Sequence, residues 1–252
     1  MGEGREGLRI GVTLPTFRDD VSFLEAAREA ESAGLHGVFC FDHLWPMGQP
    51  DRPALSSLPT LAAVACSTSS IRLGPLVARV GLLPDAVLLE SLLSLSVLAG
   101  GRLLAGIGTG DGKSVEEHSR NGLVHLGAAD RRASLERLCL RLGEAGVETW
   151  VGAGGSSTNR AAREVGVPLN FWGLPPERLR EEARRGPVTW GGPISGAPKE
   201  AAGTLSRLSA AGASWVVWGW PSSLRTVVAA AEAAGVELAT PSDPAEGGRT
   251  TG

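Results

Sequence analysis

The stretch Glu29-Ala-Glu-Ser-Ala-Gly34-Leu-His-Gly37-Val-Phe-Cys-Phe41-Asp42-His43 decides the fold of this chain. Gly34 is typical of the residue that follows a helix end. Residues 37–41 form an apolar run that is too short for a helix and is typical of a strand covered on both faces. Asp42 and His43 then lie at the C-terminal end of this strand, which is where repeated strand-helix proteins carry their chemistry.

The same pattern of strand and helix continues along the chain and predicts parallel strands with right-handed crossovers. Eight pairs, in a chain of 252 residues, predict a single (β/α)8 TIM barrel. We expect a flexible N-terminus at 1–8, the barrel at 9–240 and a disordered tail at 241–252. The expected strands are residues 9–14, 37–41, 71–77, 102–108, 148–151, 168–172, 187–190 and 214–218. The expected helices are residues 20–33 (capped by Asp20), 60–67, 84–99, 131–143, 156–165, 199–211 and 222–234, one that begins at 175, and a short one at 114–119.

An open, doubly wound sheet is the alternative fold. Such a sheet needs no eighth unit, and it usually shows a glycine fingerprint after its first strand. The residues that follow the first expected strand, Thr13-Leu-Pro-Thr16, contain no such fingerprint. The barrel is therefore the preferred prediction.

Charge and cysteine content exclude several classes of protein. The formal net charge of -3 gives no electrostatic reason to expect nucleic acid or an anionic membrane as a partner. Cys40, Cys66 and Cys139 are odd in number and have no metal-like spacing. We therefore expect buried free thiols, a reducing compartment and no metal site.

No segment of the sequence predicts a membrane span or a cleaved signal. The N-terminal residues lack an apolar core, and the most apolar expected helix, 84–99, is short and carries Asp85 and Glu90. The expected location is the cytoplasm.

Two glycine-rich loops after strands are candidates for ligand binding. Gly108-Thr109-Gly110-Asp111 follows the fourth expected strand, and Ala153-Gly154-Gly155-Ser156 follows the fifth. Glycines let the backbone approach a ring or a phosphate closely, and exposed N–H groups at a helix start attract a phosphate. The structural alternative is that these glycines only permit tight turns. Asp42 also allows two interpretations. At the end of a strand it is a candidate for chemistry, or it caps the next helix.

Four segments, taken together, resemble a known family. They are residues 26–44, which end in Phe41-Asp42-His43-Leu44, then Thr68-Ser-Ser-Ile-Arg-Leu-Gly74, residues 98–110, and Val151-Gly-Ala-Gly-Gly155. In this order and spacing the chain resembles the luciferase-like oxidoreductases, which use a flavin or a deazaflavin. The resemblance implies a TIM barrel and either FMN with oxygen or coenzyme F420, which carries hydride.

The resemblance favours the F420 branch, because Gly108-Thr109-Gly110 is followed by an acid, Asp111. It also implies a non-prolyl cis peptide at Leu76–Val77 behind the cofactor ring. The implied cofactor-binding residues are Leu76, Val77, Gly108, Thr109, Gly110, Ala153, Gly154, Gly155 and Ser156.

A mechanism follows from the resemblance as a hypothesis. A hydride passes between the deazaflavin and a small organic substrate, with His43 as the acid/base group because an imidazole titrates near neutral pH. Asp42 orients His43 or caps the following loop, and Asp111 protonates or polarises the cofactor ring. Trp45 and Trp172 are expected in the substrate pocket.

Two other functions stay open. One is an FMN-dependent monooxygenase supplied by a separate reductase, and the other is a non-catalytic barrel retained for cofactor binding or interaction. The chain is shorter than typical members of the family, so a more open site is expected. The resemblance also implies a homodimer, for which the apolar helix at 87–98 offers a surface.

Overall fold

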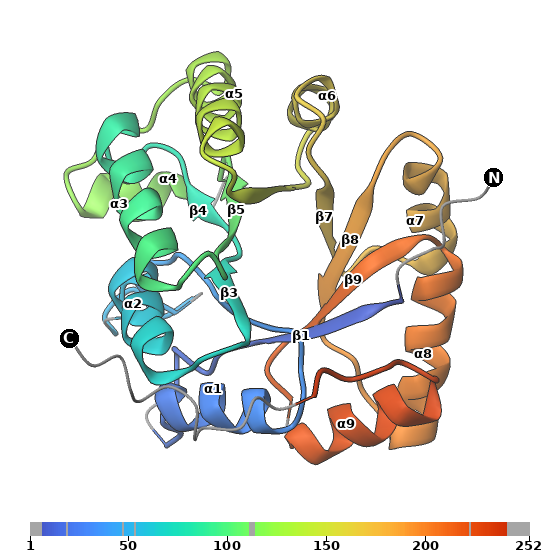
Figure 1. Ribbon diagram of the computed structural model, residues 1–252. Helices are drawn as coiled ribbons and strands as arrows, with labels where there is room; N and C mark the ends of the chain where they lie inside the picture. The colour runs from blue at the N-terminus through green and yellow to red at the C-terminus, as the bar shows by residue number, and fades with distance from the viewer. Residues whose placement is uncertain are drawn as a thin grey trace, which may run out of the picture.

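The strands of this protein form one parallel sheet that curves into a barrel (Figure 1). The computed structural model describes residues 7–18, 20–46, 48–52, 54–110, 114–221 and 223–240. The strand order is β3-β2-β1-β9-β8-β7-β6-β5-β4. The strands are β1 Arg9–Thr13, β2 Gly37–Cys40, β3 Arg72–Pro75, β4 Ala78–Arg79, β5 Leu104–Gly108, β6 Glu148–Gly152, β7 Leu169–Trp172, β8 Val188–Gly192 and β9 Ala213–Trp218.

The third strand position of the barrel is broken. A single strand at 71–77 was expected, and this expectation is wrong: β3 and β4 flank a cis peptide bond between Leu76 and Val77. The cis bond lies where the family resemblance implies it. β3 pairs with β2, β4 pairs with β5, and a bridge between Leu73 and Leu103 joins the two ends of the sheet. In the described part of the chain, β3 and β4 together occupy the third of the eight strand positions of a TIM barrel. The predicted TIM barrel is therefore confirmed.

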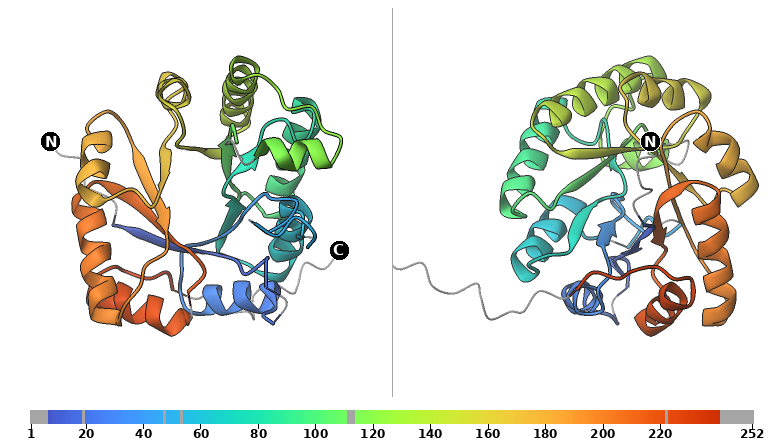
Figure 2. Two further views of the ribbon diagram at one scale, coloured as in Figure 1. Left: turned by 180° about the vertical axis from the view of Figure 1, so that it is seen from behind. Right: turned by 45° about the vertical axis from the view of Figure 1, so that its right-hand side comes forward.

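Helices cover the outside of the barrel (Figure 2). They are α1 Phe23–Ser32, α2 Ser57–Ser67, α3 Asp85–Leu98, α4 Ser114–Arg120, α5 Ala128–Glu144, α6 Ser156–Glu164, α7 Pro176–Ala183, α8 Pro198–Ala210 and α9 Leu224–Ala233.

The helix starts differ most from expectation. The cap of α1 is Ser22, whose hydroxyl accepts the Glu25 N–H at 3.3 Å. Asp20, the expected cap, pairs instead with Arg18 at 2.6 Å. Helices α2 and α5 also begin three residues earlier than expected, because their first residues, Ser57-Leu-Pro and Ala128-Ala-Asp, show no helical apolar periodicity.

Aromatic side chains fill the interior of the barrel. Phe39, Leu76, Leu104, Trp150, Trp215 and Val217 form one buried cluster. The rings of Phe39 and Trp150 stack with centroids 5.5 Å apart. This packing leaves the C-terminal mouth of the barrel as the place for a ligand.

The cysteine prediction is correct at two positions of three. Cys40 and Cys139 are buried free thiols, whereas Cys66 is exposed. Burial raises the pKa of the Cys40 thiol far above its ordinary value and that of Cys139 to about 12, so both stay protonated. No group of three potential metal ligands occurs among the described residues.

The described helices are all too short or too polar to cross a bilayer. Helix α3 exposes Val87, Val97 and Leu98 on its outer face, and the homodimer stays a prediction. The expected tail at 241–252 and residues 1–6 of the expected flexible N-terminus lie outside the described residues.

Candidate active site

A cavity of about 640 Å³ opens at the C-terminal ends of the strands. This volume lies within the usual range for small-molecule and cofactor sites. Ten of the residues predicted from the sequence line it: Asp42, His43, Leu76, Val77, Gly108, Thr109, Gly110, Ala153, Gly154 and Trp172. Trp45, Gly155 and Ser156, which are described, are not among the lining residues, and Asp111 lies outside the described residues.

Val77 forms part of the cavity wall, and two glycines make room for it. A Cβ atom on Gly108 would overlap Val77 Cγ2, and one on Gly152 would lie 3.1 Å from Val77 Cγ1. Side-chain contacts of this length require the neighbour to move. Gly108 is therefore required by the packing of Val77 and not only by the approach of a ligand.

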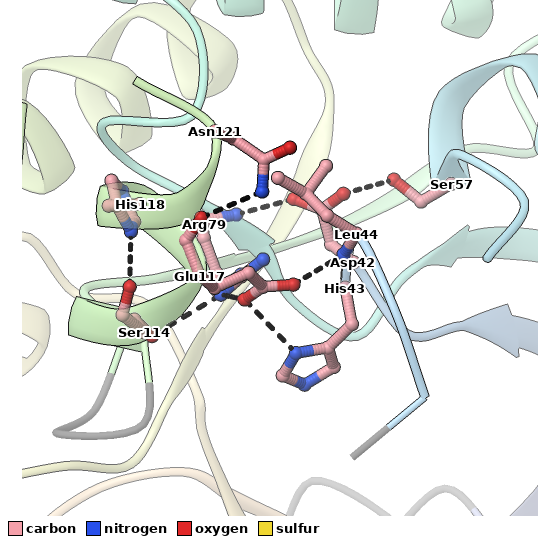
Figure 3. Close-up of polar contacts among 9 residues, drawn as sticks. All are labelled: Asp42, His43, Leu44, Ser57, Arg79, Ser114, Glu117, His118 and Asn121. Atoms are coloured by element: carbon pink, nitrogen blue, oxygen red, sulfur yellow. Dashed lines mark hydrogen bonds and ion pairs between the residues drawn. The ribbon is translucent and has the colours of Figure 1, made fainter. Parts of the chain in front are cut away.

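Asp42 forms hydrogen bonds to two elements around the cavity, β4 and α2. Its Oδ2 accepts the backbone N–H of Arg79 at 2.9 Å, and its Oδ1 accepts the Ser57 hydroxyl at 2.8 Å. Ser57 is the first residue of α2. The carboxylate thus holds the end of β2 against β4 and the start of α2 through side-chain and backbone partners, but it does not cap α2, whose N-cap residue is Ser56 (Figure 3).

The carboxylate beside His43 comes from Glu117 of α4, a residue that the sequence analysis missed. Glu117 Oε2 lies 3.5 Å from His43 Nδ1, and Glu117 Oε1 accepts the backbone N–H of Leu44 (Figure 3). Arg79 donates a further hydrogen bond to the same carboxylate. Glu117 is only 2% exposed, so these contacts form away from water.

The surroundings of Glu117 keep it ionised. Burial alone would raise the pKa of this carboxyl group. The hydrogen bonds from His43, Arg79 and the Leu44 N–H, together with the charge of Arg79, outweigh burial and lower the pKa to about 2. Glu117 is therefore a fixed negative charge next to the His43 ring at neutral pH.

Arg79 is a second residue that the sequence analysis missed. It is 5% exposed, lines the cavity, and uses its Nη1 for Glu117 and for the Ser114 hydroxyl at 3.3 Å. Its Nε and Nη2 have no partner within the described ranges. A buried cation of this kind depends on its carboxylate, so Arg79 and Glu117 form one structural unit.

The start of α6 has the features of an anion site. Gly155 caps this helix with no side-chain hydrogen bond from the described residues, so the first backbone N–H groups lack helical acceptors. Arg132 of α5 lies next to them, with its Nη1 3.4 Å from the Ser157 hydroxyl. The Gly154 N–H is already used, since it donates to Asn159 Oδ1 at 2.9 Å. Free N–H groups and a cation together suit a phosphate.

The comparisons with known proteins agree with the sequence resemblance. Residues 21–138 match the model of the luciferase-like monooxygenase family. This stretch holds β2, the broken third strand, β5 and α4, which carry much of the cavity wall. The first half of the chain is thus similar to the luciferase-like family.

A curated relative from Kineococcus radiotolerans is described as an F420-dependent glucose-6-phosphate dehydrogenase. It is 40% identical over 86 residues, which are 34% of this chain and 26% of the relative. The match thus spans about a quarter of that relative's length.

Two solved structures share the fold. One is an F420-dependent secondary alcohol dehydrogenase in complex with an F420-acetone adduct, with a TM-score of 0.74, 12% identity and coverage of 90% of this chain and 98% of the other. The other is the coenzyme F420 dependent tetrahydromethanopterin reductase from Methanopyrus kandleri, with a TM-score of 0.67, 14% identity and coverage of 90% and 97%. At these identities the likeness establishes the barrel fold.

Proposed function

We propose that this protein is an F420-dependent oxidoreductase that transfers a hydride between the deazaflavin and a small organic substrate. The observation that carries the proposal is the buried Glu117 carboxylate at His43 Nδ1, on the wall of the cavity that also contains the Leu76–Val77 cis peptide. The relatives and the shared fold support the choice of cofactor.

The cavity fits a flat ring with a phosphate-bearing tail. Leu76 and Val77 offer an apolar face for the ring, because the side chain of Val77 stands over Gly108 and Gly152. The start of α6 and Arg132 would hold the phosphate. When bound, F420 supplies a centre that accepts or donates a hydride, and the protein supplies position and proton transfer.

His43 is proposed to move the proton. In the oxidation of an alcohol, His43 Nε2 would take the proton of the O–H group while the C–H bond would give up its hydride to a bound F420, and a C=O bond would form. In the reverse reaction, His43 returns that proton to the new alkoxide oxygen. Glu117 Oε2, 3.5 Å from Nδ1, would hold the ring so that it presents Nε2 to the substrate.

We propose more limited roles for three further residues. Asp42 maintains the frame of the site through Arg79 and Ser57. Asp111 is proposed to polarise the cofactor ring, and Trp45 is proposed to act at the substrate side.

A turnover assay tests the proposal. The protein loaded with oxidised F420 is mixed with a panel of alcohols. In a second assay, the protein loaded with reduced F420 is mixed with carbonyl compounds. The absorbance of the cofactor is followed in both. We expect turnover with the wild type, and we expect His43→Ala to bind F420 with unchanged affinity while losing turnover. Equal turnover by His43→Ala would refute the role of this residue.

The runner-up is an FMN-dependent monooxygenase that receives reduced flavin from a separate reductase. The description of the matched family as luciferase-like monooxygenases favours it. Retention of FMN and oxygen uptake in the presence of a flavin reductase would support this alternative. Retention of neither cofactor would favour a non-catalytic barrel.

A further inference from the structure

Three aromatic side chains form a continuous wall across the mouth of the barrel. The rings of Phe17 and Phe41 stack with centroids 6.0 Å apart and an interplanar angle of 15°. Phe41 meets Trp172 edge to face at 5.3 Å, and Phe17 meets His43 in the same manner at 6.3 Å. All four side chains line the cavity. We name Phe17, Phe41 and Trp172 the aromatic wall.

The position of the wall follows from the strand order. Phe41 follows β2 and Trp172 ends β7, and these strands lie on opposite sides of the barrel. The Phe41–Trp172 contact therefore crosses the mouth. On one side of the barrel, β4, β5 and β6 lie between these two strands. Val77, which precedes β4, together with Gly108 of β5 and Gly152 of β6, lies close to the proposed ring site. The wall and the cofactor face thus bound the same space from opposite sides.

Trp172 is held in place although it is 46% exposed. A Cβ atom on Gly191 would lie 2.6 Å from Trp172 Cε3, so the indole occupies the space that this glycine leaves open. A large apolar side chain at the edge of a cavity, fixed by its neighbours, is typical of a binding surface.

Most of the polar groups near the wall have protein partners. Among the described lining residues, the formally charged ones are Asp42 and Arg79. Both Asp42 oxygens and Arg79 Nη1 have protein partners, whereas Arg79 Nε and Nη2 are buried without one. Asn170 donates to the Thr189 hydroxyl at 2.9 Å. His43 stands at the end of the wall and offers a group that exchanges protons. The space therefore presents aromatic area with one proton-transfer group at its edge.

We infer that the substrate is a flat, uncharged compound, a carbonyl on an aromatic or conjugated ring or the matching secondary alcohol, which stacks on the aromatic wall. This inference rests on the proposed function for the hydride and proton steps described above. It sets the substrate class apart from sugar phosphates, because the three side chains of the aromatic wall are uncharged and the Arg79 guanidinium of the same cavity is buried and paired with Glu117.

Binding measurements test this inference without turnover. Acetophenone, cyclohexyl methyl ketone and glucose 6-phosphate are titrated into the protein by calorimetry, with and without F420. The two ketones carry the same carbonyl on a flat and on a puckered ring. We expect acetophenone to bind about threefold to tenfold more tightly than cyclohexyl methyl ketone, and glucose 6-phosphate to bind most weakly.

Two variants locate the effect. Trp172→Ala removes the indole, and Gly191→Ala displaces it; both should weaken acetophenone binding about threefold to tenfold and leave F420 binding within twofold. Trp172→Phe should retain the preference for acetophenone. Val97→Ala, on the exposed face of α3, is the matched surface control and should change neither affinity.

The outcomes separate the two proposals. Equal binding of the two ketones, or tighter binding of glucose 6-phosphate, overturns the substrate class. A loss of F420 affinity in Trp172→Ala with unchanged ketone affinity overturns the assignment of the wall to the substrate. Failure of F420 to bind, with the ketone preference intact, refutes the proposed function and leaves the wall as a binding site for flat compounds.

Discussion

The Nδ1 atom of His43 lies 3.5 Å from Oε2 of Glu117. The two residues come from the loop after β2 and from α4, and the same carboxylate accepts hydrogen bonds from Leu44 and Arg79. One buried acid thus fixes a histidine, a loop and a buried arginine at the edge of the cavity. Several consequences of this arrangement are open to experiment.

Glu117→Gln should lower turnover while the protein stays folded. The amide keeps the shape of the side chain but carries no charge to hold the His43 ring in place, and hydrogen bonds to charged groups contribute about 1.5–3 kcal/mol. We expect kcat to fall roughly tenfold to a hundredfold and the dissociation constant for F420 to stay unchanged. Steady-state kinetics would show this, and an unchanged kcat would mean that Glu117 is only structural.

Glu117→Ala should destabilise the fold more than Glu117→Gln does. The truncation leaves the Arg79 guanidinium buried without its carboxylate, which typically costs about 3–5 kcal/mol. The free energy of unfolding from urea titrations measures this loss. The double variant with Arg79→Met should recover part of the stability, and no recovery would contradict the pairing.

The stability of the protein should fall in acid because of Glu117. Its pKa is lowered from 4.5 in an ordinary setting to about 2 in the folded protein, so the unfolded chain binds the proton more readily. The stabilising contribution is therefore complete above pH 4.5 and is lost as the pH falls to 2, with a total of roughly 3 kcal/mol.

Urea titrations of the wild type and Glu117→Gln across that range would test this pH dependence. The difference in unfolding free energy should shrink as the pH falls. A difference that stays constant with pH would show that the Glu117 carboxyl is not the titrating group.

Gly108→Ala should disturb Val77 and the ring site together. The added methyl group would overlap Val77 Cγ2, and overpacking of this kind costs about 1–3 kcal/mol. The combination with Val77→Ala should restore stability, as measured by thermal unfolding. Gly143→Ala, near the C-terminal end of α5 where an added Cβ meets open space, is the matched control and should stabilise the protein by up to about 0.5–1 kcal/mol.

Arg132→Gln should weaken the binding of F420 through its phosphate. The partly exposed guanidinium beside α6 contributes a screened interaction of up to about 1 kcal/mol, or about fivefold in affinity. The same deazaflavin ring and ribityl chain without the phosphate should bind equally to both proteins. An equal loss for both compounds would place the phosphate elsewhere.

The fold could be predicted from the sequence because each strand and helix carries its own local signal. The apolar run at 37–41 and the glycine at 34 mark one α/β unit, and seven further units repeat this pattern. The cis bond in the third strand was accessible only through the family resemblance, since no local pattern distinguishes a cis from a trans bond between two non-prolyl residues such as Leu76 and Val77.

The site was predictable only in part. His43 and the glycines lie at strand ends, where topology alone brings them together. Glu117 and Arg79 meet through contacts between segments distant in the sequence, and a charged residue on a short helix gives no sign of such burial. Asp42 was recognised by position, but its partners, Ser57 and the Arg79 backbone, follow from the packing of α2 and β4.

The most direct measurement is a fluorescence titration of the purified protein with F420 and with FMN, each oxidised and reduced. The account predicts saturable binding of F420, weaker or no binding of FMN, and the same F420 affinity in His43→Ala. Binding of FMN alone, or of neither cofactor, would contradict the assignment of this barrel as an F420-dependent oxidoreductase.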